Sequence, residues 1–374
     1  MNFFTKSSLR ARRIERASRR KNGPGRRGKF FKKALRFQHG ILTMKILFTS
    51  MADSSKPISR ASRGLYRFAV FTTSFTILLL MAGALVTNND AGDSIPTWPL
   101  AHNDALFPPH FVGGIRFEYS HRVVAGIVSL LTLILAIWIT KVDKRALAKK
   151  LGWTAVGLVL AQAALGGFRV LGSDPSASAT AHATLGQIFF ITLVGITVYL
   201  SPWWQSDPPQ FEDRGLPRAA AVASATMGVI LAQVLLGAAY RHGILNIVPH
   251  LIGAAAVTFM VIWVARVIKR RFRESRTLRK GVVFLHAFFG IQILLGFAAW
   301  WTMTRPDDLV QPTGVFVSLT VAHVLGGALL LASSTILMLM CFHLTAPAHV
   351  AAGSPVTPSP TATAAGGSAE RVGG

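Results

Sequence analysis

Cysteine is almost absent from this chain: its 374 residues include a single one, Cys341. One cysteine excludes an internal disulfide, a cysteine-based metal site and paired-thiol redox chemistry. Acidic residues are also scarce, with 15 aspartates and glutamates against 40 lysines and arginines. Any metal or redox chemistry in this protein therefore depends on other side chains.

Long apolar runs are abundant. Hydrophobic residues make up 51% of the chain, and a helix needs about 20 mostly apolar residues to cross a bilayer. Eight stretches reach that length, at 68–87, 121–140, 151–171, 179–200, 219–240, 244–265, 281–301 and 315–341. The sequence therefore predicts an all-α membrane protein with eight transmembrane helices and excludes a soluble core as its main architecture.

The net charge of +25 is distributed in a way that predicts topology. Residues 1–60 contain 17 lysines and arginines against two acids, and the links at 141–150 and 266–280 contain five and eight basic residues. The intervening links contain few. The positive-inside rule places the basic segments in the cytoplasm. We therefore expect a multi-pass plasma membrane protein with both termini cytoplasmic, surrounded by lipid and without a nucleic-acid partner.

A pair of helices is repeated four times along the chain. Three odd-numbered spans carry a glutamine four residues before a glycine, and each even-numbered span opens with a histidine followed by a nearby glycine. The glutamine and glycine pairs are Gln162 and Gly166, Gln233 and Gly237, and Gln292 and Gly296; the histidine and glycine pairs are His121 and Gly126, His182 and Gly186, His250 and Gly253, and His323 and Gly326. The four glycines that follow the histidines leave room for a flat cofactor or for close helix contact, and both explanations stay open.

Offsets of 130 residues from Gln162 to Gln292 and 129 from His121 to His250 divide the repeats into two halves. We expect two pseudo-symmetric four-helix bundles in the same orientation, related by an axis along the membrane normal. The expected domains are a basic, disordered N-terminal tail at 1–64, an N-terminal bundle at 65–200, a cytoplasmic linker at 201–218, a C-terminal bundle at 219–343 and a disordered cytoplasmic tail at 344–374.

The four repeated histidines are the candidate metal ligands. A single histidine in an apolar helix is more often a packing or interfacial residue, but four at matching positions favour ligation. His121 and His182 belong to one bundle, and His250 and His323 to the other. Each pair is placed to bind the iron of one planar macrocycle axially, which predicts two haem sites.

Glu118 makes the two predicted sites unequal. It lies three residues before His121, on the same face if the second span extends outward, whereas the matching residue before His250 is Ile247. A carboxylate at membrane depth needs a partner or a function. This asymmetry suggests one reaction site and one electron-transfer or structural site; the alternative is an ion pair of Glu118 with Arg122 or Arg116.

Arg169 and Arg241 stand at the outer ends of the third and fifth spans. They are candidates to bind haem propionates, and interfacial anchoring is the open alternative. His242 and His286 lack repeated counterparts, so we expect packing or surface roles for them.

With these residues in hand, the chain resembles the haem A synthase family over about 65–343. The resemblance rests on the loop GALVTNNDAGDSIPTWPL from Gly83, the E-x-x-H-R element at Glu118 to Arg122, the repeated Q-x-x-L-G helix ends and the histidines at 182, 250 and 323. Many family members also carry cysteine pairs in their outer loops, and this chain has none.

The resemblance implies oxidation of a methyl group of haem O to a formyl group, giving haem A for terminal oxidases. It implies that His121 and His182 hold the substrate haem with Glu118 assisting, and that His250 and His323 hold haem b. Haem O synthase and an electron donor of unknown identity are the implied partners, and a homo-oligomer stays open. Two other functions also fit four axial histidines: a b-type cytochrome that only carries electrons, and a haem transport or assembly protein.

Overall fold

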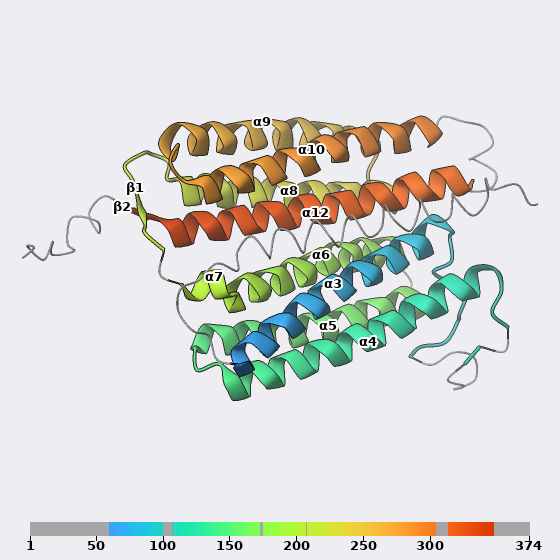
Figure 1. Cartoon of the computed structure of the whole chain (residues 1–374). Coiled ribbons are helices and arrows are strands. Elements are labelled where there is room, and N and C mark those ends of the chain that lie inside the picture. The colour runs from blue at the N-terminus through green and yellow to red at the C-terminus, as the bar shows by residue number, and fades with distance from the viewer. Residues whose placement is uncertain are drawn as a thin grey trace, which may run out of the picture.

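The computed structural model describes residues 60–99, 107–108, 110–172, 175–206, 208–303 and 313–347 (Figure 1). In these ranges the protein is all-α apart from two three-residue strands. Eight of the described helices are long and apolar enough to cross a membrane, which identifies a multi-pass membrane protein. They are α3 (Arg60–Asn88), α4 (Gly113–Val142), α5 (Ala146–Leu171), α6 (Pro175–Leu200), α8 (Ala219–Arg241), α9 (Ile247–Arg271), α10 (Arg276–Met303) and α12 (Gly314–Leu344).

The long helices pack in two groups of four. Helices α3 to α6 contact one another along one side of the molecule, and α8, α9, α10 and α12 do so along the other (Figure 1). Helices α6 and α12 lie between the groups, because α6 also contacts α8 and α12 also contacts α3. Their apolar windows are accordingly 50% and 44% buried, against 17% for the peripheral α10. The core is continuous across the contact, where Phe190 and Val194 of α6 pack with residues of α8, α9 and α12.

Different structural elements lie at the two ends of the helix array. At one end, which we call the histidine end, α3 finishes, α4 begins and the loop between them lies (right in Figure 1). The opposite end, the linker end, carries α7 (Pro202–Gln205), β1 (Phe211–Asp213) and β2 (Thr345–Pro347) (left in Figure 1). The second, fourth, sixth and eighth spans, which are α4, α6, α9 and α12, start at the histidine end and run toward the linker end. Between each two of them another span returns the chain to the histidine end.

Helix α4 begins eight residues earlier than the apolar run that predicted it, at Gly113 in place of residue 121. Hydropathy missed these two turns because they contain Arg116 and Glu118. The turns are nonetheless helical, since Glu118 is buried and finds polar partners in the preceding loop. The extension puts Glu118 and His121 on one helix face.

Two boundaries of the expected tails were wrong. Residues 60–64, expected in the N-terminal tail, form the first turn of α3. Residues 345–347, expected in the C-terminal tail, form β2, which pairs in parallel with β1 of the linker. Backbone hydrogen bonding to β1 orders this short segment, which its composition alone did not predict. The remainder of both expected tails, residues 1–59 and 348–374, lies outside the described residues.

Polar and aromatic side chains attach the linker to the helices at the linker end. The Asp213 carboxylate, 1% exposed, accepts a hydrogen bond from the Ala219 backbone N–H at 2.6 Å and pairs with Arg271 at 3.3 Å. The ring of His343, near the end of α12, stacks on Trp204 with centroids 4.4 Å apart. The linker is therefore attached to α8, α9 and α12 at this end of the array.

Candidate haem-binding site

The four histidines lie as two facing pairs. The ring centroids of His121 on α4 and His182 on α6 are 6.2 Å apart, with ring planes at 77°. Those of His250 on α9 and His323 on α12 are 6.4 Å apart, with ring planes at 80°. Each group of four helices thus contains one pair, contributed by its two even-numbered spans.

The separation within each pair fits a metal ion between the rings. A bond of about 2 Å from a metal to an imidazole nitrogen leaves the ring centre about 3 Å from the metal, so two axial rings are separated by roughly 6 Å. No group of three or more histidine, cysteine or acidic residues in the described ranges could hold a metal ion. Two protein ligands suit haem iron, whose other four ligands come from the porphyrin.

Each histidine ring packs against a glycine of the preceding helix. A Cβ atom added at Gly237 would lie 2.9 Å from Cε1 of His250, and one added at Gly296 would lie 2.9 Å from Cε1 of His323. The corresponding distances are 3.2 Å from Gly83 to His121 and 3.5 Å from Gly166 to His182. The repeated glycine at the end of each odd span therefore provides the space that the ring occupies.

The repeated glutamines contact the same histidines. The Gln162 side-chain amide donates to the His182 backbone carbonyl at 3.0 Å, and the Gln162 backbone carbonyl lies 3.1 Å from Nδ1 of His182. The Gln233 amide lies 3.1 Å from Nδ1 of His250 and donates to its carbonyl at 2.9 Å. A ring N–H that donates to a carbonyl, as Nδ1 of His182 can to Gln162, orients a metal ligand and leaves the other ring nitrogen to face the metal.

Of the glycines that follow the histidines, three lie beside these glutamines. A Cβ at Gly186, Gly253 or Gly326 would meet the side chain of Gln162, Gln233 or Gln292, respectively. These glycines thus provide close helix contact, one of the two explanations left open above. Gly126 differs: it is exposed and has nothing within 4 Å of an added Cβ. Its spacing from the histidine is five residues, against four for Gly186 and three for Gly253 and Gly326.

The Glu118 carboxylate is buried, and both of its oxygens accept hydrogen bonds. Its Oε1 accepts from Arg122 at 2.6 Å, and its Oε2 accepts from the backbone N–H of Ile95 at 2.9 Å. Arg122 also donates to the Thr97 carbonyl at 2.7 Å. The expected alternative, an ion pair with Arg122, is therefore present, and it ties the loop before α4 to the helix face that carries His121.

Arg169 and Arg241 hold the same loop. Arg169 pairs with Asp93 at 2.8 Å, while Arg241, on α8, donates to the Thr87 carbonyl at 2.8 Å and lies 4.0 Å from Asp90. The two aspartates are mostly exposed, at 73% and 81% of their side chains. Exposed ion pairs contribute little, typically about 0.2–1 kcal/mol, so a stronger anionic ligand can displace them.

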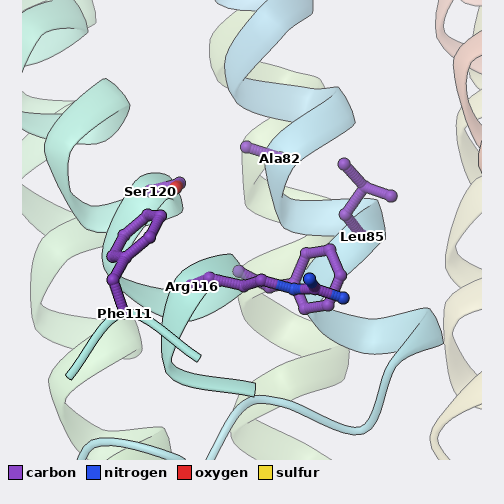
Figure 2. Close-up of a pocket in the computed structure, with 6 residues that line it drawn as sticks. Ala82, Leu85, Phe111, Arg116 and Ser120 are labelled. Carbon is purple, nitrogen blue, oxygen red and sulfur yellow. The ribbon is translucent and has the colours of Figure 1, made fainter. Parts of the chain in front are cut away.

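A cleft of about 220 Å³ opens at the histidine end between α3 and α4, lined by Ala82, Leu85, Phe111, Arg116, Phe117 and Ser120. Figure 2 shows Arg116 extending from α4 across this cleft toward α3. Its guanidinium lies 4.7 Å from the Phe117 ring centroid, so Arg116 does not take the role of Glu118's partner. Cofactor sites usually measure 300–1,000 Å³, so the cleft is too small for a porphyrin.

His286 and His242 belong to neither pair. Nδ1 of His286 lies 2.8 Å from the Val282 carbonyl of its own helix, in agreement with the packing role expected. His242 caps the C-terminus of α8, where burial, followed by the charges of Arg241 and Arg169, lowers its pKa to about 4. His242 is therefore uncharged near neutral pH.

Sequence reasoning identified the repeated glutamines and glycines of the odd spans but gave them no role toward the histidines. Their spacing was the available clue, because each glutamine and glycine recurs one helix before a histidine. The contacts of Asp90 and Asp93 had no such pattern, since they depend on how the loop folds back over the helix ends.

Comparison with known proteins finds similarity to a family of cytochrome oxidase assembly proteins and to haem A synthases. A family model described as COX15-CtaA, cytochrome oxidase assembly protein, matches residues 34–194 and 110–246, more than half of the chain. A haem A synthase of Exiguobacterium sp. (strain ATCC BAA-1283 / AT1b) is 35% identical over 36% of this chain and 44% of the relative. A haem A synthase of Halalkalibacterium halodurans is 30% identical over 39% of this chain and 50% of the relative.

The matches to those two relatives therefore span about half of their length or less. A longer match links the chain to a haem A synthase of Symbiobacterium thermophilum, which is 25% identical over 71% of this chain and 85% of the relative.

Proposed function

Because this chain belongs to the COX15-CtaA family of cytochrome oxidase assembly proteins, we propose that it is a haem A synthase, an oxidoreductase that converts the methyl group of haem O to a formyl group. The facing histidine pairs carry this proposal. Their separations fit two iron-centred macrocycles, and only one pair has a carboxylate one helical turn away. A cytochrome that only carries electrons, or a haem transport protein, would not require that difference.

In the proposed mechanism His121 and His182 hold the iron of the substrate haem O, and His250 and His323 hold haem b. Haem b supplies one-electron redox chemistry when bound. The Gln233 amide contacts the His250 ring and donates to its backbone carbonyl, and Gly237 leaves space for that ring between α8 and α9. These contacts keep the ligand in place without a covalent constraint.

Glu118 assists at the substrate pair by two routes in this proposal. It presents a carboxylate on the face of α4 that carries His121, where positive charge developing on the substrate would be stabilised. It also holds the Ile95 backbone, and with Arg122 it fixes the loop over this end of the group. A fixed loop limits the access of water to the reacting substituent.

Arg169 and Arg241 bind haem propionates in the same proposal. Both guanidinium groups lie at the histidine end and have weakly held acidic partners, Asp93 and Asp90. Propionates entering the site would replace those partners, because a less exposed carboxylate forms the stronger pair with arginine.

The proposed location is the plasma membrane with both termini in the cytoplasm. The basic links at 141–150 and 266–280 lie at the linker end, so the positive-inside rule places that end inside the cell and the histidine pairs toward the outside. Haem O synthase is the proposed source of substrate, and reduction requires a separate electron donor.

The test is co-expression of the full chain with a haem O synthase, followed by extraction and chromatography of the haems. Haem A or its hydroxylated intermediate is expected to accumulate. Haem O that persists unchanged beside folded, haem b-containing protein in the presence of a reductase partner would overturn the proposal. Glu118→Ala is expected to stop turnover with the bis-histidine spectrum retained, whereas His250→Ala and His323→Ala are expected to lose haem b.

A further inference from the structure

Arg241 belongs to one group of helices but makes its polar contacts with the other. It lies on α8 in the second group (α8, α9, α10 and α12), whereas the first group (α3 to α6) carries the first pair, His121 and His182. Its guanidinium donates to the backbone carbonyl of Thr87, on α3, at 2.8 Å and lies 4.0 Å from the carboxylate of Asp90, in the loop after α3. The end of α8 therefore reaches across to the first group.

Arg169, on α5 of the first group, lies on the same side of the first pair. It comes three residues after Gly166, against which the His182 ring packs, and its charge acts on that ring. The ring of His242, the residue after Arg241, is in turn close enough to Arg169 and His182 for their charges to act on it. Two arginines, one from each group, thus lie near the His182 side of the first pair.

One short stretch of loop contacts both guanidinium groups. Asp90 lies beside Arg241, and Asp93 pairs with Arg169 at 2.8 Å. Between the two aspartates, Gly92 lies so close to the Arg169 guanidinium that a Cβ added there would clash with it. Because three residues span at most about 11 Å, two carboxylates on a short segment are enough to reach both arginines.

The Arg241 guanidinium has hydrogen-bonding capacity that its present contacts leave unused. Its Nε is buried and has no hydrogen-bond partner in the described parts of the chain. The Asp90 carboxylate, at 4.0 Å, is beyond hydrogen-bond distance and is 81% exposed. A buried N–H without an acceptor is unfavourable, and a carboxylate is the acceptor that matches two guanidinium N–H groups at once. Arg241 is therefore suited to an anionic ligand that binds more closely than Asp90.

The second histidine pair lacks an arginine at the position that matches Arg169. Arg169 comes three residues after the glycine that receives the His182 ring. The residue three positions after the glycine that receives the His323 ring is Ala299. Together with the contacts of Arg241, this difference favours the first pair as the one that both arginines serve.

We propose that Arg169 and Arg241 bind the two propionates of one and the same haem, the substrate of the first histidine pair. Haem carries both propionates at one edge of the macrocycle, as the loop carries two carboxylates three residues apart, so one macrocycle replaces both Asp90 and Asp93. The second group of helices thereby supplies a substrate-binding residue to the first. The inference rests on the proposed function in taking haem O as the ligand of the first pair.

The experiment compares haem O with its dimethyl ester, in which both propionates are uncharged. Full-length protein that already contains haem b is titrated with each compound and followed by absorbance. A hydrogen bond to a charged group typically contributes about tenfold or more to binding, so the wild type is expected to prefer haem O about 100-fold. In Arg241→Gln and in Arg169→Gln the preference should fall to about tenfold, with the haem b content unchanged.

Arg116→Gln is the matched control, because Arg116 lies at the same end of the array but in the cleft between α3 and α4. It should keep the wild-type preference. An equal preference for haem O in wild type and Arg241→Gln would overturn the inference. Loss of haem b from Arg241→Gln, with haem O binding unchanged, would also overturn it, because the arginine would then serve the second pair.

Removing the two aspartates gives a test of opposite sign that does not depend on the folding of an arginine variant. Asp90 has a φ of 46°, a conformation that asparagine also tolerates, so Asp90→Asn/Asp93→Asn should retain the loop. Exposed ion pairs contribute up to about fivefold each. The double variant should therefore bind haem O more tightly by up to that factor per pair, with little change for the ester. Unchanged or weaker binding of haem O would contradict the replacement of these aspartates by propionates and overturn the inference.

Haem chromatography after co-expression of the same variants with a haem O synthase separates this inference from the proposed function. The expected preferences without any haem A would leave the propionate site in place and remove the enzymatic assignment. Haem A formation by a protein whose preference for haem O over the ester does not depend on Arg241 would retain that assignment and remove the inference.

Discussion

Replacing Gly237 by alanine should separate the stability of the fold from the binding of haem. The added Cβ would lie 2.9 Å from Cε1 and 3.2 Å from Nδ1 of His250. Ordinary van der Waals contact begins at 3.4 Å, so the imidazole ring has to retreat by about 0.5 Å. Axial ligation tolerates little displacement, because the ring nitrogen must remain about 2 Å from the metal.

The two consequences of Gly237→Ala have opposite signs. Alanine in a helix interior is favoured over glycine by about 0.5–1 kcal/mol, which stabilises α8 in the haem-free protein. Disturbing the surroundings of a metal ligand typically costs 10- to 100-fold in affinity, or about 1.4–2.8 kcal/mol. We therefore expect an unchanged or raised thermal midpoint without haem, together with weaker haem b binding.

Gly228→Ala is the matched control. Gly228 lies on the same helix, is exposed, and has nothing within 4 Å of an added Cβ. It should gain the same helix stability and keep its haem. The assay is haem titration followed by absorbance, with thermal unfolding of the haem-free protein in the same detergent. Wild-type haem affinity in Gly237→Ala would refute the claim that this glycine accommodates the ligand ring.

Three further predictions concern charged groups. Arg122→Leu should reduce haem A formation and leave haem b content unchanged, because Arg122 holds Glu118 and the loop before α4 but contacts neither histidine of the second pair. Hydrogen exchange of the backbone amides of residues 89–99 should become faster in this variant. Unchanged exchange would contradict the prediction. The pKa of His242, held near 4 against an ordinary 6.5, favours the uncharged form, so stability should be complete above pH 6.5 and fall toward pH 4. Thermal unfolding across that range should show a smaller loss in His242→Asn, and an equal loss would count against the assignment. Asp213→Ala should destabilise the protein by about 2 kcal/mol, because the carboxylate loses its hydrogen bond from the Ala219 backbone N–H and its ion pair with Arg271. The measurement is the thermal unfolding midpoint, which should fall. An unchanged midpoint would show that these two interactions do not contribute to stability.

The number and approximate position of the long helices could be predicted from sequence because crossing a bilayer requires long apolar runs. The start of α4 could not, since its first two turns include Glu118, and hydropathy does not register a charge satisfied by a distant backbone group such as Ile95 N–H. Strand β2 was missed for a related reason: three residues carry no recognisable pattern, and their partner β1 lies far away in the chain.

Repetition provided an internal comparison for the candidate site residues. The four histidines were selected by their matching places, and the structure places them in two facing pairs. Glycine spacing was less informative. The glycine follows its histidine by five residues at Gly126, by four at Gly186 and by three at Gly253 and Gly326, and the last three all lie beside a glutamine.

The pairing of β1 with β2 sets an order on biosynthesis. Strand β1 leaves the ribosome before the last four spans are made, yet its partner follows the very last of them. Strand β1 must therefore remain without this partner until translation is nearly complete, which makes the pairing a late step of assembly. A reporter fused directly after Leu344 should leave β1 open in every finished molecule, whereas the same reporter fused after Gly374 should allow it to close.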